Sequence, residues 1–173
     1  SNHPQRFFEV LREVGALRVV LPELDAQFGV PQTARYHPEI DAGIHTLMCL
    51  QASAAAQDSL AVRFAVLCHD FGKGITPRAV WPSHKGHESR GIPLVEAVCQ
   101  RLRVPKACKE LAVKVCEWHL HGHRAAELRP ATLLKVLDAL DVWRRPQRLE
   151  DFLAACTADA RGRTGYEQTA YPQ

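Results

Sequence analysis

Apolar residues recur every three or four positions along most of the chain, which is the spacing of one face of an α-helix. The first run predicts a helix from about residue 7 to residue 20, which Pro22 would end. Residues 21–38 hold three prolines and a glycine, so we expect a long connection with little regular structure. The residues that carry the first helical pattern are Phe7, Val10, Leu11, Val14 and Leu17.

The rest of the chain repeats this pattern between residues that favour helix ends. Asp58 and Ser59 suit an N-cap, and Pro105, Pro130 and Pro146 suit helix starts, because proline is favoured at the first helical position. No segment alternates between apolar and polar residues as a strand does. We therefore predict an all-α fold, a single bundle of about six or seven helices. The further helices are expected at 39–57, at 59–70, at 87–103, at 105–119, from 130 onward and at 146–159.

Length and composition suit one soluble unit. We divide it into an N-terminal helix with its connection, residues 1–38, and a main domain, residues 39–173. No apolar run approaches the roughly 20 residues of a membrane helix. The six cysteines form no Cys-x-x-Cys pair, which argues against a zinc ribbon or a thioredoxin motif. Most of them fall on apolar helical faces, as free cysteines do, which indicates a reducing, cytoplasmic setting. The net charge of +3 does not by itself indicate a nucleic-acid partner.

A histidine and an aspartate stand side by side where one predicted helix ends. His69 and Asp70 precede Gly72 and Gly74, which we expect to stop that helix. Imidazole and carboxylate ligands suit Mn, Fe, Co, Ni, Zn or Mg without choosing among them. His45 lies 24 positions before His69, about a helix, a turn and a helix back, so antiparallel packing can bring the two together.

The spacing alone does not show that the more distant Asp159 joins this pair. The alternative is that the histidines belong to the core and that the aspartate is solvated.

Two further histidine groups are candidates for the same site. His84 and His87 fall in a predicted loop, residues 72–86, and at the following helix start, where helix N–H groups attract phosphate. His119, His121 and His123 fall at a helix end, where His119 is a candidate for an extra ligand or a substrate contact. A surface rich in histidine, or histidines that favour the helix dipole, would explain both groups without a function.

Basic residues offer binding groups for an anionic phosphoester. Lys73 lies between two glycines, and Arg161 and Arg163 follow Asp159. Solvated charge is the alternative for each. A basic face for RNA is a weaker hypothesis, and its residues are Lys135, Arg144, Arg145 and Arg148.

The motifs around these residues resemble one known family. Residues 37–46 (HPEIDAGIHT), 68–74 (CHDFGKG) and 158–165 (ADARGRTG) are similar to the C-terminal HD region of bacterial CCA-adding tRNA nucleotidyltransferases, within the HD phosphohydrolase superfamily. The resemblance implies that residues 39–173 form an HD domain that binds a divalent metal. It implies Ni, Mg, Mn or Co, with nickel favoured for a phosphatase activity. The implied metal ligands are His45, His69, Asp70 and Asp159.

The resemblance also implies an activity, namely 2′,3′-cyclic phosphodiesterase, 2′-nucleotidase and phosphatase action on tRNA 3′ ends or nucleotide phosphoesters. We assign catalysis to His69, Asp70, Lys73, His84 and His87, and substrate binding to Lys73, His119 and Arg161. The chain lacks the Gly-Ser loop and Asp-x-Asp pair of a nucleotide-adding head, so we expect a fragment that does not add CCA.

Two alternatives stay open. The domain could be a non-catalytic module that binds tRNA or forms a homodimer, or a phosphohydrolase of free nucleotides.

Overall fold

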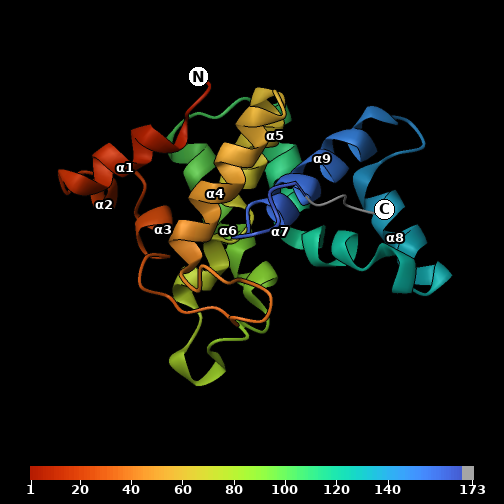
Figure 1. Cartoon of the computed structure of the whole chain (residues 1–173). Helices are drawn as coiled ribbons and strands as arrows, with labels where there is room; N and C mark the ends of the chain where they lie inside the picture. The colour runs from red at the N-terminus through yellow and green to blue at the C-terminus, as the bar shows by residue number, and fades with distance from the viewer. Residues whose placement is uncertain (169–173) are drawn as a thin grey trace.

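The computed structural model describes residues 1–168, and within them the fold is all-α, as the sequence predicts (Figure 1). Nine α-helices are joined by loops and three 3₁₀ helices, η1 (Phe71–Ile75), η2 (Arg78–Val80) and η3 (Ala125–Glu127), in the described part of the chain. Pro31 and Asp41 make the only β-type pairing there, an isolated bridge. The helices are α1 (Gln5–Glu13), α2 (Leu17–Val20), α3 (Pro22–Asp25), α4 (Ala42–Ala55), α5 (Leu60–Cys68), α6 (His87–Arg101), α7 (Lys106–His123), α8 (Pro130–Leu140) and α9 (Gln147–Arg161).

The N-terminal segment differs from its prediction. The expected helix over 7–20 is broken between α1 and α2, where Gly15 has a positive φ of 71° that ends a helix. Pro22 opens the four-residue α3, since proline fits the first helical position. The short helices α2 and α3 account for the difference between the nine helices described and the six or seven expected.

Side-chain caps fix where the next two helices begin. Asp41 accepts a hydrogen bond from the Ile44 N–H at 2.9 Å and caps α4. The expected start at residue 39 was wrong because Ile40 has a φ of +61°, which a helix does not accommodate. The predicted cap of α5 is confirmed, since the Ser59 hydroxyl accepts from the Val62 N–H at 3.3 Å.

The glycines after His69 and Asp70 do not stop the helix as the sequence suggested. α5 ends at Cys68, and the chain continues as η1 with neither Gly72 nor Gly74 at positive φ. Gly72 is required for a different reason, because a Cβ there would lie 1.9 Å from the carbonyl oxygen of His87. A bare backbone at this point lets η1 pack directly against α6.

α5 is central to the bundle and packs against α4, α7 and α9, while α6 packs against α7 and η1 (Figure 1). Leucines of α2 and α3 enter the same hydrophobic core, so the N-terminal segment is packed onto the bundle. No helix of residues 1–168 is long and apolar enough to cross a membrane. The fully buried core side chains include Leu17, Leu24, Val62, Phe71, Val95, Val98, Cys116, Leu140 and Phe152.

Candidate metal centre

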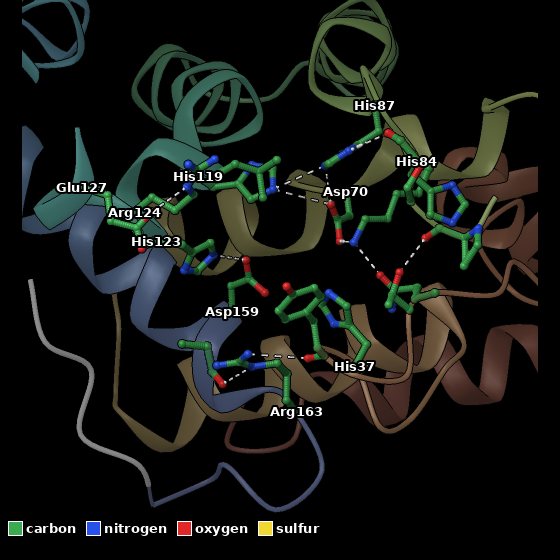
Figure 2. Close-up of a pocket in the computed structure, with 18 residues that line it drawn as sticks. His37, Asp70, His84, His87, His119, His123, Arg124, Glu127, Asp159 and Arg163 are labelled. Carbon is green, nitrogen blue, oxygen red and sulfur yellow. Dashed lines mark hydrogen bonds and ion pairs between the residues drawn. The ribbon is translucent and has the colours of Figure 1, made fainter. Parts of the chain in front are cut away.

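Helices α6, α7 and α9, together with η1 and neighbouring loops, direct polar side chains toward one cavity of about 660 Å³ (Figure 2). Asp70 follows α5 with φ −108° and ψ 13°, a sparsely populated backbone conformation that is common at active sites. α4 supplies the buried His45 behind this cavity, and α9 supplies Asp159 from its last turn. The lining includes His37, Asp70, Lys73, His84, His87, His119, His123, Arg124, Glu127, Asp159 and Arg163.

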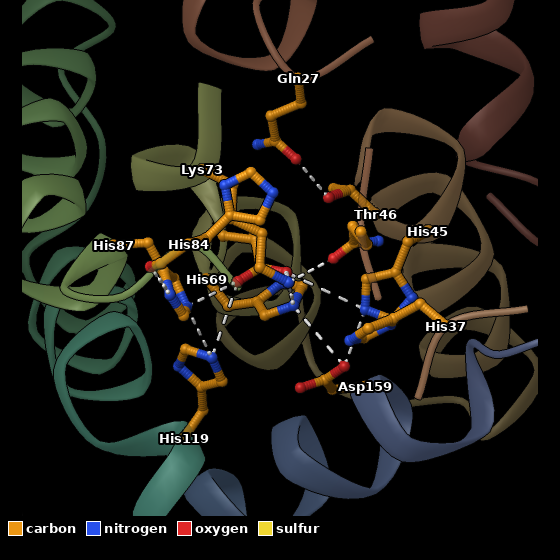
Figure 3. A network of polar contacts seen from close by, with 12 residues as sticks. Gln27, His37, His45, Thr46, His69, Lys73, His84, His87, His119 and Asp159 are labelled. Atoms are coloured by element: carbon orange, nitrogen blue, oxygen red, sulfur yellow. Dashed lines mark hydrogen bonds and ion pairs between the residues drawn. The ribbon is translucent and has the colours of Figure 1, made fainter. Parts of the chain in front are cut away.

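The first cluster brings together the residues that the sequence placed at a metal. His45 Nε2 lies 2.9 Å from Asp159 Oδ1, although 114 positions separate these residues. His69 Nε2 lies 3.7 Å from the same oxygen and 3.1 Å from Asp70 Oδ2. His45 Nε2 lies 4.0 Å from Asp70 Oδ2. Figure 3 shows the side chains of His45, His69 and Asp159 close together. All four side chains are at least nine-tenths buried.

Asp70 connects this cluster to a second one through its other oxygen. Asp70 Oδ1 lies 3.1 Å from His87 Nε2 and 3.7 Å from His119 Nε2. Lys73 Nζ lies 2.6 Å from Asp70 Oδ2. Neither oxygen of Asp70 has a correctly directed hydrogen bond, although both are buried, and the same holds for His69 Nε2. Buried polar atoms without hydrogen bonds are costly, so these atoms are left available for another partner.

The orientation of the imidazole rings explains which nitrogen faces the centre. Nδ1 lies 3.1 Å from Gly162 O in His45, 2.7 Å from Val66 O in His69, 3.0 Å from His84 O in His87 and 3.0 Å from Val115 O in His119. A carbonyl only accepts, so each Nδ1 carries the proton. In a neutral ring each Nε2 then presents a lone pair, which is the orientation of a metal-binding histidine fixed by its backbone partner.

The absence of a side chain at Gly162 allows the contact between its carbonyl and His45 Nδ1. A Cβ on Gly162 would lie 2.4 Å from the sulfur of Cys49 and 2.5 Å from its Cα. Without a side chain, the end of α9 approaches α4 closely enough for the Gly162 carbonyl to accept from His45. Glu39 adds a carboxylate oxygen 2.9 Å from the same Nδ1.

The charges within the centre stabilise one another. Burial alone would raise the pKa of Asp70, but nearby His69 and Lys73 hold it well below its usual value. Burial would likewise raise the pKa of Asp159, but His123 and His69 hold it well below. For His69, burial lowers the pKa, yet Asp70 and Asp159 raise it above the ordinary value. Both carboxylates are therefore ionised and ready to bind a cation at neutral pH.

The second cluster has a defined proton arrangement. Burial lowers the pKa of His119 to about 3, so this ring is neutral, and Nδ1 holds its proton. His119 Nε2 is then an acceptor, 3.5 Å from His87 Nε2. His87 Nε2 also faces Asp70 Oδ1 at 3.1 Å.

The other predicted site residues fall in different surroundings. His84 lines the cavity, but both of its nitrogens contact protein oxygens, at 2.6 Å from Thr76 Oγ1 and 2.8 Å from Pro31 O. Burial lowers the pKa of His84 and keeps it neutral. Arg161 does not line the cavity, and its charge acts on the Asp58 carboxyl.

The predicted basic face of α8 and α9 is largely compensated. Arg144 pairs with Asp141 at 2.7 Å, and Arg145 and Arg148 both pair with Glu110. These pairs reduce the net charge available to an RNA backbone.

The sequence reasoning missed Cys49. Its sulfur lies 3.3 Å from His45 Nε2 and groups with His45, His69 and Asp159 as a candidate ligand set. Burial raises the pKa of this thiol to about 11, so it is neutral when no cation is present. Its position four residues after His45 on one helix was the available signal, because such residues share a face.

His123 was recognised only as a residue that shares a face with His119. The structure extends α7 to His123 and places its Nε2 2.6 Å from Asp159 Oδ2.

The donor set fits a divalent cation. Imidazole nitrogens with carboxylate oxygens suit first-row transition ions, and a further oxygen or sulfur ligand is at hand in Asp70 or Cys49. The unbonded His69 Nε2 and Asp70 oxygens are the atoms that such an ion would satisfy.

Buried histidines and aspartates from five distant segments meet inside an all-α bundle. These observations define a class of protein, the metal-binding helical domain. The chain belongs to the HD domain family, which residues 42–143 match. This confirms the family that the motifs suggested and supports a divalent-metal centre.

Curated relatives carry the name Multifunctional CCA protein. The chain is 56% identical over its whole length of 173 residues to those of Pseudomonas savastanoi pv. phaseolicola and Vibrio cholerae, and 59% identical to that of Alkalilimnicola ehrlichii. It spans about 42–43% of the length of these relatives.

Proposed function

We propose that this domain is a divalent-metal-dependent phosphohydrolase that acts on phosphoesters at RNA 3′ ends. The expected reactions are 2′,3′-cyclic phosphodiesterase, 2′-nucleotidase and phosphatase activity in tRNA 3′-end maturation. The similarity to Multifunctional CCA proteins supports tRNA as the source of the substrate. Six free, buried cysteines fit a reducing cytoplasm. Dimer formation stays a prediction.

The observation that carries this proposal is the convergence of ligand atoms. His45 Nε2 and His69 Nε2 lie 2.9 and 3.7 Å from Asp159 Oδ1. The pKa of each ring is raised despite burial, so without a metal the protons on these rings balance the buried carboxylates. A divalent cation held by His45, His69, Asp70 and Asp159 would take the place of these protons and supply the same positive charge.

Several polar residues of the cavity then have a role in the reaction. A divalent ion acts as a Lewis acid on phosphoryl oxygens and lowers the pKa of water. Lys73 Nζ contacts Asp70 Oδ2 and Gln32 Oε1, and its remaining N–H is available to a phosphoryl oxygen. His87 Nε2 lies between Asp70 and His119, and a protonated His87 would donate from this atom to a leaving oxygen. His119 and Asp159 fix the orientation of His87 and His123.

Hydrolysis of 2′,3′-cyclic AMP tests the proposal. The parent, Asp70→Asn and Asp138→Asn would be assayed with nickel, magnesium or a chelator, and products separated by chromatography. Asp138 lies on exposed α8 away from the cavity and is the matched control. We expect turnover by the parent and the control, and at least about a hundredfold loss in Asp70→Asn, because the ligand that joins both clusters is removed. Equal rates in the parent and Asp70→Asn would contradict the proposal.

A further inference from the structure

One permanent cation at the cavity lacks a carboxylate partner among residues 1–168. Lys73 lies 2.6 Å from Asp70 Oδ2, and Arg124 donates to Glu127 at 3.1 Å. Arg163 also lines the cavity, but no ion pair to it occurs in the described part of the chain (Figure 2). Its positive charge is thus available to an anion that enters the cavity.

The Arg163 guanidinium is held in place by neutral groups. Nε donates to the Ala160 carbonyl at 2.8 Å, and Nη1 donates to the Tyr36 carbonyl at 3.5 Å. The ring of Tyr166 lies 4.5 Å from the guanidinium carbon. A guanidinium has five N–H donors, so three remain after these two contacts. An ordered, uncompensated guanidinium with free donors is suited to a phosphate.

Arg163 is adjacent in sequence to a residue that contacts His45, one of the proposed metal ligands. The residue before it, Gly162, accepts a hydrogen bond from His45 Nδ1 at 3.1 Å. Consecutive Cα atoms are 3.8 Å apart, so the backbone of Arg163 directly follows the carbonyl that contacts the His45 ring. A phosphate bound by Arg163 is therefore a neighbour of the phosphate that reacts at the centre.

An aromatic ring lies beside the same arginine. Tyr36 lines the cavity, is 55% exposed and is joined to Arg163 through its carbonyl. Exposed aromatic rings next to cationic groups are the stacking platforms by which proteins bind single-stranded RNA. A nucleotide that precedes the terminal one would therefore meet both a cation and an aromatic ring in the cavity.

We infer that the cavity binds an RNA 3′ end of at least two nucleotides. The terminal phosphate binds at the histidine and aspartate centre, and the preceding phosphodiester binds Arg163. The base of the nucleotide before the terminal one stacks on the ring of Tyr36. This inference rests on the proposed function and adds to it a binding subsite for the nucleotide that precedes the RNA 3′ end.

Equilibrium binding separates the inference from hydrolysis. Calorimetry would compare adenosine 3′-monophosphate with the 3′-phosphorylated dinucleotide ApAp, in chelator so that the terminal phosphate is retained. The parent should bind ApAp at least about tenfold more tightly, since a charged hydrogen bond and a stacked base are added. In Arg163→Gln this ratio should fall toward one. The salt slope of log affinity for ApAp should also decrease by about 0.7, the value for one phosphate contact on a single strand.

The controls distinguish recognition from damage to the fold. Arg18→Gln removes an exposed arginine of α2 outside the cavity and should keep the parent ratio. A structural defect in Arg163→Gln would weaken both ligands equally and leave the ratio unchanged, which would overturn the inference. Equal affinity of the parent for the two ligands would overturn it as well. If the parent binds ApAp more tightly than adenosine 3′-monophosphate but hydrolyses neither compound when metal is added, only the proposed hydrolase activity is contradicted.

Discussion

The partners of the two ring nitrogens determine what each histidine of this site can bind. His45, His69, His87 and His119 direct Nδ1 to backbone carbonyls and Nε2 to the centre. His84 differs, because Thr76 and Pro31 occupy both of its nitrogens. We therefore propose that His84 positions the loop that follows η1 against the segment before α4, in place of the catalytic role that its sequence position suggested.

Substitutions of His84 and Thr76 test this role. His84→Ala leaves the Pro31 carbonyl and the Thr76 hydroxyl without their buried partner, so the free energy of unfolding should fall by about 2 kcal/mol. Thr76→Val should remove part of the same interaction. The double variant should lose less than the sum, with a coupling of about 1 kcal/mol in urea unfolding. Unchanged stability of His84→Ala with a loss of turnover would instead assign His84 to the chemistry.

At the scale of elements, close backbone approaches determine the site. η1 carries Lys73 and packs against α6, which carries His87, and Gly72 is the point of contact. A side chain there would separate the two elements and with them Lys73 and His87.

Gly72→Ala should lower the free energy of unfolding by about 3 kcal/mol, since its Cβ would meet the backbone oxygen of His87 at 1.9 Å. Gly74→Ala is the matched control, because its Cβ would lie 3.1 Å from atoms of Ala26 and requires only a small shift. We expect a loss of about 1 kcal/mol or less there. Chemical unfolding of both variants measures the difference, and equal losses would contradict the assigned contact.

Helices with strong local signals could be predicted from the sequence. The Ser59 cap, the start of α8 at Pro130 and the reach of α9 to Asp159 depend on neighbouring residues, and all three are present. The break at Gly15 and the late start of α4 after Ile40 depend on single positive-φ residues, which apolar periodicity does not reveal.

The site was predictable only in part for a related reason. The motif residues His45, His69, Asp70 and Asp159 do converge. The choice between Arg161 and Arg163 depends on how the chain turns after α9, and spacing within the sequence carries no information about that turn.

At the scale of the whole molecule, the centre exists only when distant segments pack together. α4, the end of α5 with η1, α6, α7 and α9 each contribute to it (Figure 3). Their packing holds ionised Asp70 and Asp159 side chains in a buried place, which is costly without a cation. Metal binding is therefore the central claim on which the proposed hydrolysis depends.

The most direct measurement is the metal content of the purified chain after nickel loading and extensive dialysis. The parent should retain at least one nickel ion per chain by elemental analysis, and Asp159→Asn should retain at least tenfold less under the same dialysis, because an ionised ligand is lost. Glu127→Gln, which removes an exposed carboxylate at the cavity, should retain as much as the parent. A parent without nickel, or equal content in Asp159→Asn, would contradict the account.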